Sequence, residues 1–287
     1  LGHLSYIAQH SNLWSKNFIQ TANIDATVTK YWDDADDDSD GDRYNDDNDV
    51  TSTGNNEGFL PIGRNNISST LFTGEYDGGG YTIDNLTIYR PQTTKYTGFF
   101  GSANGATIRN LSLTNDNTTA KFVTGSLVGY ATSSTIDNCS VSGSVTASTS
   151  YLGGLVGYIN GSTIRNSFST ASVDSGGGSY IGGLVGYINS TTLLNSYSTG
   201  SVESASSNSG GLVGYKNGGT VTDSFYDATT SGKSDTGKGT GKTTAQMKTL
   251  ATFTDTATTG LSTSWDFNSI WNIDTSGTIN DGYPYLR

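Results

Sequence analysis

The strongest chemical signal in the sequence is a run of aspartates near the N-terminus. Residues 33–49 hold ten Asp and one Arg, and residues 36–42 match the Asp-x-Asp-x-Asp-Gly opening of a calcium loop. Calcium takes about six to eight oxygen ligands from a flexible loop. The predicted ligands are side chains at loop positions one, three and five, the backbone carbonyl at seven and the carboxylate at twelve: Asp36, Asp38, Asp40, Asp42 and Asp47.

The last of these positions limits the affinity that we expect. An EF-hand has a bidentate Glu there, and the shorter Asp47 predicts binding in roughly the millimolar range of extracellular modules. Asp46 and Asp49 are alternative ligands, so one or two ions are expected. The competing interpretation is a solvated acidic loop, which Asp runs often form. Gly41 in register and the repulsion among ten carboxylates favour calcium.

A column of tyrosines forms the second candidate binding site. Tyr130, Tyr158, Tyr187 and Tyr215 recur with a period of about 28 residues. If successive coils lie about 4.8 Å apart, exposed rings would form a strip on which sugar rings stack. The competing interpretation is a structural ladder, which we favour because large side chains usually bury most of their area. The same alternatives apply to Phe168, Tyr197 and Phe225.

Residues that carry catalysis are not arranged as a recognisable site. The only histidines are His3 and His10, and the sequence has neither a His-Glu-x-x-His nor a Gly-x-Ser-x-Gly motif. The column of Arg109, Asp137 and Arg165 offers no convergent pair of acids. We therefore expect no enzymatic activity, with a polysaccharide-active β-helix enzyme as a minor alternative by analogy of fold.

Two other segments suggest chemistry but have simpler interpretations. Residues 237–244 look like a phosphate loop, but Thr236 stands where that motif requires a Gly, so we expect a surface loop. Cys139 is the single cysteine, which excludes an internal disulfide and a multi-cysteine metal site. We expect it to be a small buried filler.

The elements that must position these residues follow from an internal repeat. Residues 98–101 recur as 126–129, 154–157, 183–186 and 211–214, at steps of 28 or 29 residues. Further columns keep the same period: Ile108, Ile136, Ile164, Leu193 and Val221; then Asn110, Asn138, Asn166, Asn195 and Asp223; then Val145, Val173 and Val202. One such unit cannot bury its apolar side alone, whereas stacked units can. We expect the Asn column to occupy left-handed corners and to hydrogen-bond from coil to coil.

The predicted fold is all-β: a right-handed parallel β-helix, or β-solenoid, with three-faced coils of about 28 residues. We expect one domain over 1–287, with an N-terminal helical cap and first coil (1–30) and the acidic insertion (31–58). Early coils (59–97), regular coils (98–230) and a loop with a C-terminal capping segment (231–287) follow. The expected plug of the far end is aromatic: Trp265, Phe267, Trp271, Tyr283 and Tyr285.

Composition agrees with this fold and excludes several functions. The chain has 38 Gly, 17 Tyr and only 14% charged residues, which suits short strands and tight turns. Its net charge of −11 lies mostly in residues 33–49, and no basic stripe for nucleic acid exists. No apolar run is long enough to insert in a membrane. Leu1 follows no visible signal peptide and is not a natural start, so we expect a mature or excerpted segment.

The repeats resemble those of the GLUG-motif proteins of bacterial and archaeal surfaces. The match is close at residues 154–157 with 164–170 and at 183–186 with 195–200. Residues 59–63, 72–78, 243–248 and 282–286 are similar to the entry and closing segments of that family. The resemblance implies a secreted or cell-surface β-helix, often part of a long adhesin-like protein. Some members accompany an immunoglobulin-cleaving metallopeptidase domain, which this sequence lacks.

We therefore expect a calcium-stabilised, extracellular, adhesin-like module that presents a rigid face to a glycan or a cell-surface protein. The first alternative is a structural subunit that self-associates end to end, because residues 33–49 and the loop with Lys233, Lys238 and Lys242 differ in charge. Ice binding through Thr107, Thr135, Thr163, Thr192 and Thr220 is a minor alternative, since neighbouring charges disturb a flat surface.

Overall fold

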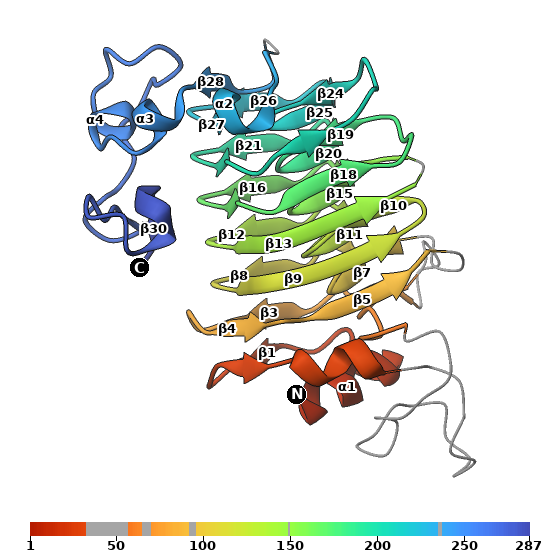
Figure 1. The fold of residues 1–287 in the computed structure, drawn as a ribbon. Coiled ribbons are helices and arrows are strands. Elements are labelled where there is room, and N and C mark those ends of the chain that lie inside the picture. Colours follow the sequence, from red (N-terminus) through yellow and green to blue (C-terminus); the bar gives the residue numbers. More distant parts are fainter. Residues whose placement is uncertain (33–56, 65–69, 92–95, 149, 235–236) are drawn as a thin grey trace.

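The chain winds into a parallel β-solenoid whose coils stack one on the next (Figure 1). This computed structural model describes residues 1–32, 57–64, 70–91, 96–148, 150–234 and 237–287. The strands that join successive coils pair in parallel, for example β12 with β16, which places Ile136 beside Ile164. The prediction of an all-β parallel solenoid with coils of about 28 residues is confirmed.

Two sheets form the faces on either side of the asparagine corner. Sheet 1 consists of β1 (Phe18–Ile19), β3 (Glu75–Asp77), β8 (Thr107–Arg109), β12 (Thr135–Asp137), β16 (Thr163–Arg165), β21 (Thr192–Leu194) and β26 (Thr220–Thr222). Sheet 2 consists of β2 (Ile24–Asp25), β4 (Thr82–Asp84), β5 (Thr87–Arg90), β9 (Ser112–Ala120), β13 (Ser140–Ala147), β17 (Phe168–Ser169), β18 (Ser172–Ser175), β22 (Tyr197–Ser198), β23 (Val202–Glu203), β27 (Phe225–Asp227) and β28 (Thr240–Lys242).

The remaining side of each coil carries two shorter sheets instead of the single face that we expected. Sheet 3 consists of β6 (Tyr96–Thr97), β10 (Val123–Gly125), β14 (Leu152–Gly153), β19 (Ile181–Gly182) and β24 (Ser209–Gly210). Sheet 4 consists of β7 (Phe100–Asn104), β11 (Val128–Thr132), β15 (Val156–Asn160), β20 (Val185–Asn189) and β25 (Val213–Asn217). The backbone bends between them at Gly154, where a Cβ would lie 2.3 Å from the carbonyl oxygen of Gly183, so only glycine fits.

Alternation along each strand separates the core from the surface. In β16, Ile164 is fully buried while Thr163 and Arg165 point outward. Leu155, Val156 and Val173 from the other sheets are also fully buried in the same core. Each apolar side chain therefore packs against its counterparts in the coils above and below, as the repeat predicts.

The corner between sheets 1 and 2 depends on asparagine. Asn110, Asn138, Asn166 and Asn195 have φ between 47° and 53°, which confirms the predicted left-handed conformation. The expected coil-to-coil bond occurs from Asn138 Nδ2 to Asn110 Oδ1 at 3.3 Å. Asn166 does not continue this Asn-to-Asn pattern, because its Nδ2 donates to Asp137 Oδ1 at 3.1 Å.

The N-terminal cap is helical, as predicted, and covers the first coil (Figure 1). It contains α1 (Gly2–Gln9) and η1 (Ser11–Leu13), and η2 (Thr27–Tyr31) follows the first two strands. Leu4, Ile7 and Ala8 are buried against the coil. Trp14 secures the cap, because its indole Nε1 donates to the carbonyl of Ile7 at 2.8 Å.

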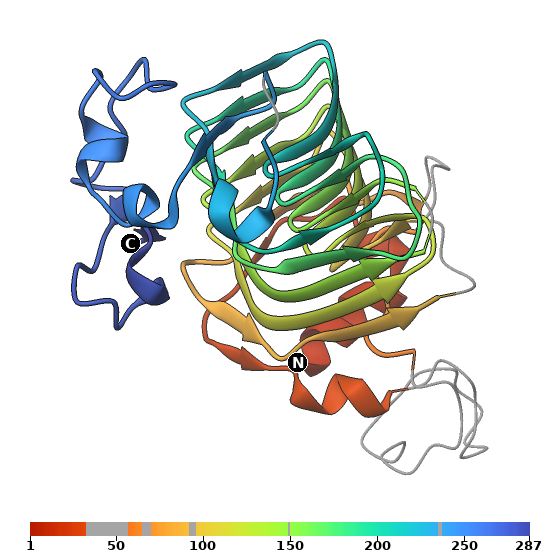
Figure 2. The ribbon, with the colours of Figure 1, turned by 45° about the horizontal axis from the view of Figure 1, so that its top comes forward.

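The C-terminal segment lies against the flank of the solenoid and not over its far end, which corrects the predicted plug (Figure 2). It contains α3 (Thr244–Met247), α4 (Ala251–Thr254), η5 (Asn280–Gly282) and the antiparallel pair β29 (Trp271–Asn272) and β30 (Tyr285–Leu286), and it follows α2 (Ala228–Ser231). The reason is the outward column of Phe168, Tyr197 and Phe225 on sheet 2. Trp265, Trp271 and Tyr283 bury that column, and Phe267 and Leu286 lie at the margin of the same cluster.

Among the buried carboxyl groups of the described residues, that of Asp116 has a strongly raised pKa. Asp116 in β9 is 1% exposed and accepts a hydrogen bond from Thr118 Oγ1 at 2.9 Å. Burial raises its pKa from 3.8 to about 7, although the hydrogen bond from Thr118 opposes the shift. The group is therefore best accommodated in its protonated form.

The stacked core gives a first prediction. Replacing Ile164, which is fully buried, with alanine should destabilise the protein by about 2–5 kcal/mol through lost transfer energy and a cavity. Urea unfolding of Ile164→Ala and of the neighbouring outward variant Thr163→Ala measures this. The Thr163 variant should change the free energy of unfolding by less than about 1 kcal/mol. Equal losses in both variants would contradict the inward packing.

Asp116 gives a second prediction. Because its folded pKa is raised to about 7, the folded state keeps a proton between about pH 4 and pH 7 that the unfolded chain has already lost. Stability should fall as the pH rises through that window. Asp116→Asn should remove this slope and be more stable than the parent at pH 8, by up to about 4 kcal/mol, with little difference at pH 4. Melting temperatures across pH 4–8 test it, and an unchanged slope in the variant would disprove the assignment.

Candidate functional site

The predicted calcium ligands lie outside the part of the chain that the structure describes. This applies to Asp36, Asp38, Asp40, Asp42 and Asp47, all within residues 33–56. Among the described residues, no group of three or more His, Cys, Asp or Glu side chains is placed to hold a metal ion. Calcium binding therefore stays a prediction from the sequence.

The four tyrosines predicted to form a column do lie together on sheet 4. Tyr130, Tyr158, Tyr187 and Tyr215, here called the Tyr strip, occupy equivalent outward positions in β11, β15, β20 and β25. Their ring centroids lie 4.8–5.3 Å apart and successive planes differ by only 5–26°. The first three side chains are half-buried, while Tyr215 in the last coil is 38% exposed.

Three tyrosines outside the predicted column extend this cluster. Tyr96 stacks on Tyr130 at 5.0 Å, and Tyr151 and Tyr180 stack on each other at 5.1 Å. Tyr151 and Tyr180 meet the edges of Tyr158 and Tyr187 at nearly right angles. A signal existed in the sequence, since both precede an apolar residue and two glycines, 29 residues apart.

A second ladder runs beside the Tyr strip. Asn160, Asn189 and Asn217, here called the amide ladder, lie two residues after the tyrosines on the same strands. Asn189 Nδ2 donates to Asn160 Oδ1 at 2.8 Å, and Asn217 Nδ2 donates to Asn189 Oδ1 at 3.0 Å. Both ladders follow from the parallel register, which sets each residue beside its counterpart in the next coil.

The geometry determines how such a surface can interact. Neighbouring tyrosines cover one another's ring faces, so a ligand beside the strip meets ring edges, hydroxyl groups and amides. The pKa values of Tyr158 and Tyr187 are raised, mainly by burial and to a smaller extent by the neighbouring tyrosines. Their hydroxyl groups therefore stay protonated at neutral pH and can both donate and accept hydrogen bonds.

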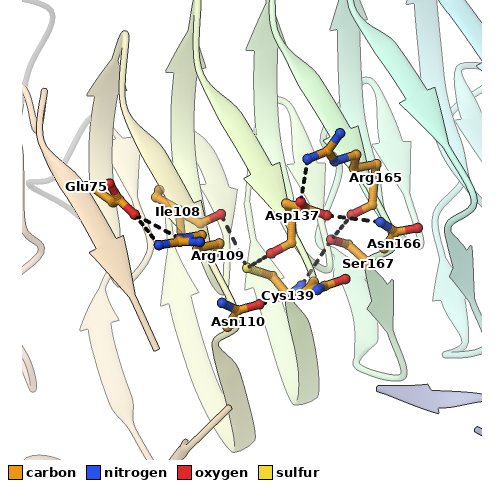
Figure 3. Close-up of polar contacts among 10 residues, drawn as sticks. Glu75, Ile108, Arg109, Asn110, Asp137, Cys139, Arg165, Asn166 and Ser167 are labelled. Carbon is orange, nitrogen blue, oxygen red and sulfur yellow. Dashed lines mark hydrogen bonds and ion pairs between the residues drawn. The ribbon is translucent and has the colours of Figure 1, made fainter. Parts of the chain in front are cut away.

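The charged column on sheet 1 is occupied by ion pairs (Figure 3). Arg165 Nη2 lies 2.7 Å from Asp137 Oδ2. Arg109 Nη2 lies 2.7 Å from Glu75 Oε1 and 3.0 Å from Asp77 Oδ2. These carboxylates are engaged by arginines, so they do not form a free acid pair of the kind that glycoside hydrolysis needs.

Figure 3 also shows Cys139, whose sulfur lies between Ile108 and Asp137. The thiol is fully buried and contacts the carbonyl oxygens of Asp137 and Ile108. Burial raises its pKa to about 12, so the thiolate does not form at neutral pH. The side chain is the buried filler that we expected.

The lysines after the last coil contact the chain itself. Lys238 Nζ donates to the carbonyl oxygens of Gly214 at 2.8 Å and Ser209 at 3.2 Å. Lys242 Nζ donates to Thr259 O at 2.8 Å, and Lys233 Nζ donates to Ser204 O at 3.3 Å. Lys238 thus places a positive charge beside β24 and β25. Among the described strands, these are edge strands of sheets 3 and 4.

Comparison with known proteins agrees with this architecture. The GLUG motif matches residues 122–146 and 148–174, which confirms the predicted resemblance in two successive coils. No curated protein matches the chain in sequence. Among solved structures, the chain is similar to the crystal structure of "a putative immunoglobulin A1 protease" from Bacteroides ovatus. The TM-score is 0.60 at 18% identity, over 98% of this chain and 89% of that chain.

At that identity the likeness shows the fold alone. In the described part of the chain, helices are too short or too polar to cross a bilayer. Stacked parallel coils, the asparagine corner and the two motif matches agree with one another. The chain is a parallel β-solenoid that carries GLUG motifs in its central coils.

Proposed function

We propose that this chain is an extracellular, non-enzymatic binding module, adhesin-like, that presents the face of sheet 4 to a glycan or a cell-surface protein. The observation that carries the proposal is the Tyr strip beside the amide ladder. Phenol hydroxyls and amides at regular spacing offer donors and acceptors together. Tyrosine is also favoured at binding surfaces because it supplies contact area at low entropic cost.

The rigidity of the scaffold supports this function. Tyr158 is held by Tyr130 and Tyr187 on either side and by the edge of Tyr151. The strands beneath are joined to both neighbouring coils by parallel ladders. A surface fixed before binding loses little conformational freedom on binding, which favours affinity.

A catalytic role receives less support from the residues. The similar Bacteroides ovatus structure is named "a putative immunoglobulin A1 protease", but this sequence has no His-Glu-x-x-His motif. On the described part of sheet 1, Glu75, Asp77 and Asp137 are paired with arginines. We therefore propose binding and not turnover.

The end-to-end filament is the weaker of the two non-enzymatic roles. The lysines invoked for head-to-tail attraction donate to carbonyl groups of their own chain. A charged side chain beside an edge strand discourages pairing with another chain.

We propose a secreted or cell-surface location, with residues 36–47 binding calcium, because calcium loops of this type occur in extracellular modules.

Glycan binding tests the proposed face. A glycan array probed with the full chain should show binding that falls about tenfold or more in the double variant Tyr158→Phe/Tyr187→Phe. That variant keeps the stacked rings and loses only the hydroxyl groups, each worth about 1 kcal/mol or more when hydrogen-bonded. The matched control is Tyr81→Phe/Tyr89→Phe, since both residues are exposed outside the strip. Equal binding by all three proteins, or none by the parent, would refute the proposed face.

Calcium binding has a separate test. Isothermal titration of the full chain with calcium should give a dissociation constant in roughly the millimolar range, and Asp38→Asn/Asp40→Asn should weaken it about tenfold or more. Asp174→Asn/Asp255→Asn removes the same charge elsewhere and should leave the affinity unchanged. If both double variants weaken binding alike, the effect is a general loss of negative charge and not a calcium loop.

A further inference from the structure

A polar cleft forms where the C-terminal segment meets the asparagine corner. Its volume is about 370 Å³, at the lower end of the range for small-molecule sites, which begins near 300 Å³. Figure 2 shows this segment standing beside the edge where sheets 1 and 2 meet. One wall comes from the solenoid and the other from Ser269, Ile270, Leu286 and Arg287. The cleft exists only because the segment packs on the flank.

The solenoid wall is a fixed chain of hydrogen bonds. Asp77 Oδ1 accepts from Gly79 N and from Asn110 Nδ2, both at 2.9 Å. Asn110 Oδ1 in turn accepts from Asn138 Nδ2 at 3.3 Å. Ser112 adds a hydroxyl group that accepts from Ser140 Oγ at 2.8 Å, which leaves its own proton available to a ligand.

The C-terminal wall combines a held guanidinium with apolar surface. Arg287 donates from Nε to Trp271 O and from Nη2 to Phe267 O, both at 2.9 Å. Ile270 and Leu286 line the same wall with carbon atoms. Both belong to the margin of the aromatic cluster that anchors the segment, so this wall is also held in place.

The charged groups that face the cleft are already paired. Asp77 Oδ2 lies 3.0 Å from Arg109 Nη2, a guanidinium that also pairs with Glu75. Arg287 interacts electrostatically with the nearby carboxylate of Asp266. Neither a strongly anionic nor a strongly cationic ligand would therefore find an unpaired opposite charge here. Amides, hydroxyl groups and a small apolar wall instead match a ligand with many hydroxyl groups and one face of C–H bonds.

We propose that the corner cleft binds one residue of a neutral carbohydrate, at a site separate from the Tyr strip. The sugar's hydroxyl groups accept hydrogen bonds from the side-chain Nδ2 groups of Asn110 and Asn138 and bond to the hydroxyl group of Ser112. Its C–H face lies against Ile270 and Leu286. This site uses another surface and other residues, so it stands or falls independently of the function proposed for sheet 4.

The test uses two glycines with the same backbone requirement. Gly80 lines the cleft with φ 78°, and Gly161 lies in a distant turn with φ 54°; a Cβ at either would meet open space. Asparagine tolerates positive φ, so Gly80→Asn adds a side chain to the cleft and Gly161→Asn is its matched control. Both variants should fold and lose a similar, small amount of stability, because each places a side chain at positive φ.

Side-chain amide resonances of Asn110 and Asn138, followed by NMR in the full chain, report binding directly. The probes are glucose, galactose, mannose and N-acetylglucosamine at millimolar concentrations. At least one should shift these resonances in the parent and in Gly161→Asn, with an affinity about tenfold or more weaker in Gly80→Asn. The proposal is overturned if none of these sugars shifts them, or if Gly80→Asn binds as well as its control. It is also overturned if inorganic phosphate or calcium shifts them while the sugars do not.

Discussion

The parallel register between coils is the constraint on which the rest of this structure depends. In the regular coils, an interior strand hydrogen-bonds to the strand one repeat earlier and to the strand one repeat later, so Ile164 lies beside Ile136 and Leu193. A residue type that recurs every 28 or 29 positions is thereby stacked on itself at the spacing of neighbouring strands. The repeat suits side chains that tolerate such stacking, and it is unfavourable for those that repel one another.

The surface columns include side chains that stack favourably on their own kind and charged side chains that would repel their own kind. Tyrosines stack at 4.8 Å between Tyr158 and Tyr187, and asparagine amides link into chains, because rings and amides attract their own kind. Like charges directly opposite would be destabilising. The charged column on sheet 1 accordingly alternates in sign, with Arg109, Asp137 and Arg165 in successive coils. The same register that stacks the Tyr strip on sheet 4 therefore places arginines beside the acids on sheet 1.

The flank of the solenoid adds what the repeat by itself does not supply. The stacked column of Phe168, Tyr197 and Phe225 would be a large exposed apolar surface if nothing covered it. The C-terminal segment covers it and is fixed by polar contacts, including Tyr283 Oη to Asp227 Oδ2 at 2.8 Å and Trp265 Nε1 to Asp223 O at 2.9 Å. Covering the flank brings residues 269–287 to the asparagine corner, where the cleft forms.

The sequence by itself determined the coils, because their cause is periodic and local. The spacing of Ile136 and Ile164 required stacked strands, and the position of Asn138 and Asn166 required left-handed corners, and both are present. The sequence also predicted the tyrosine column, because residues separated by one repeat pair in register in a parallel solenoid. Its members are Tyr130, Tyr158, Tyr187 and Tyr215. Its ring-to-ring stacking was favoured on size alone.

The positions of residues that do not follow the repeat were decided only by the tertiary structure. Trp265 and Trp271 occur once each, so no repeat indicates whether they close an end or cover a flank; the free energy of burying the aromatic column selected the flank. The bend at Gly154 depends on the closeness of the Gly183 carbonyl in the next coil. Asp77 and Arg287 are 210 positions apart in the sequence and share a cleft. Contacts between distant, non-repeating residues arise from packing, which no spacing within the chain encodes.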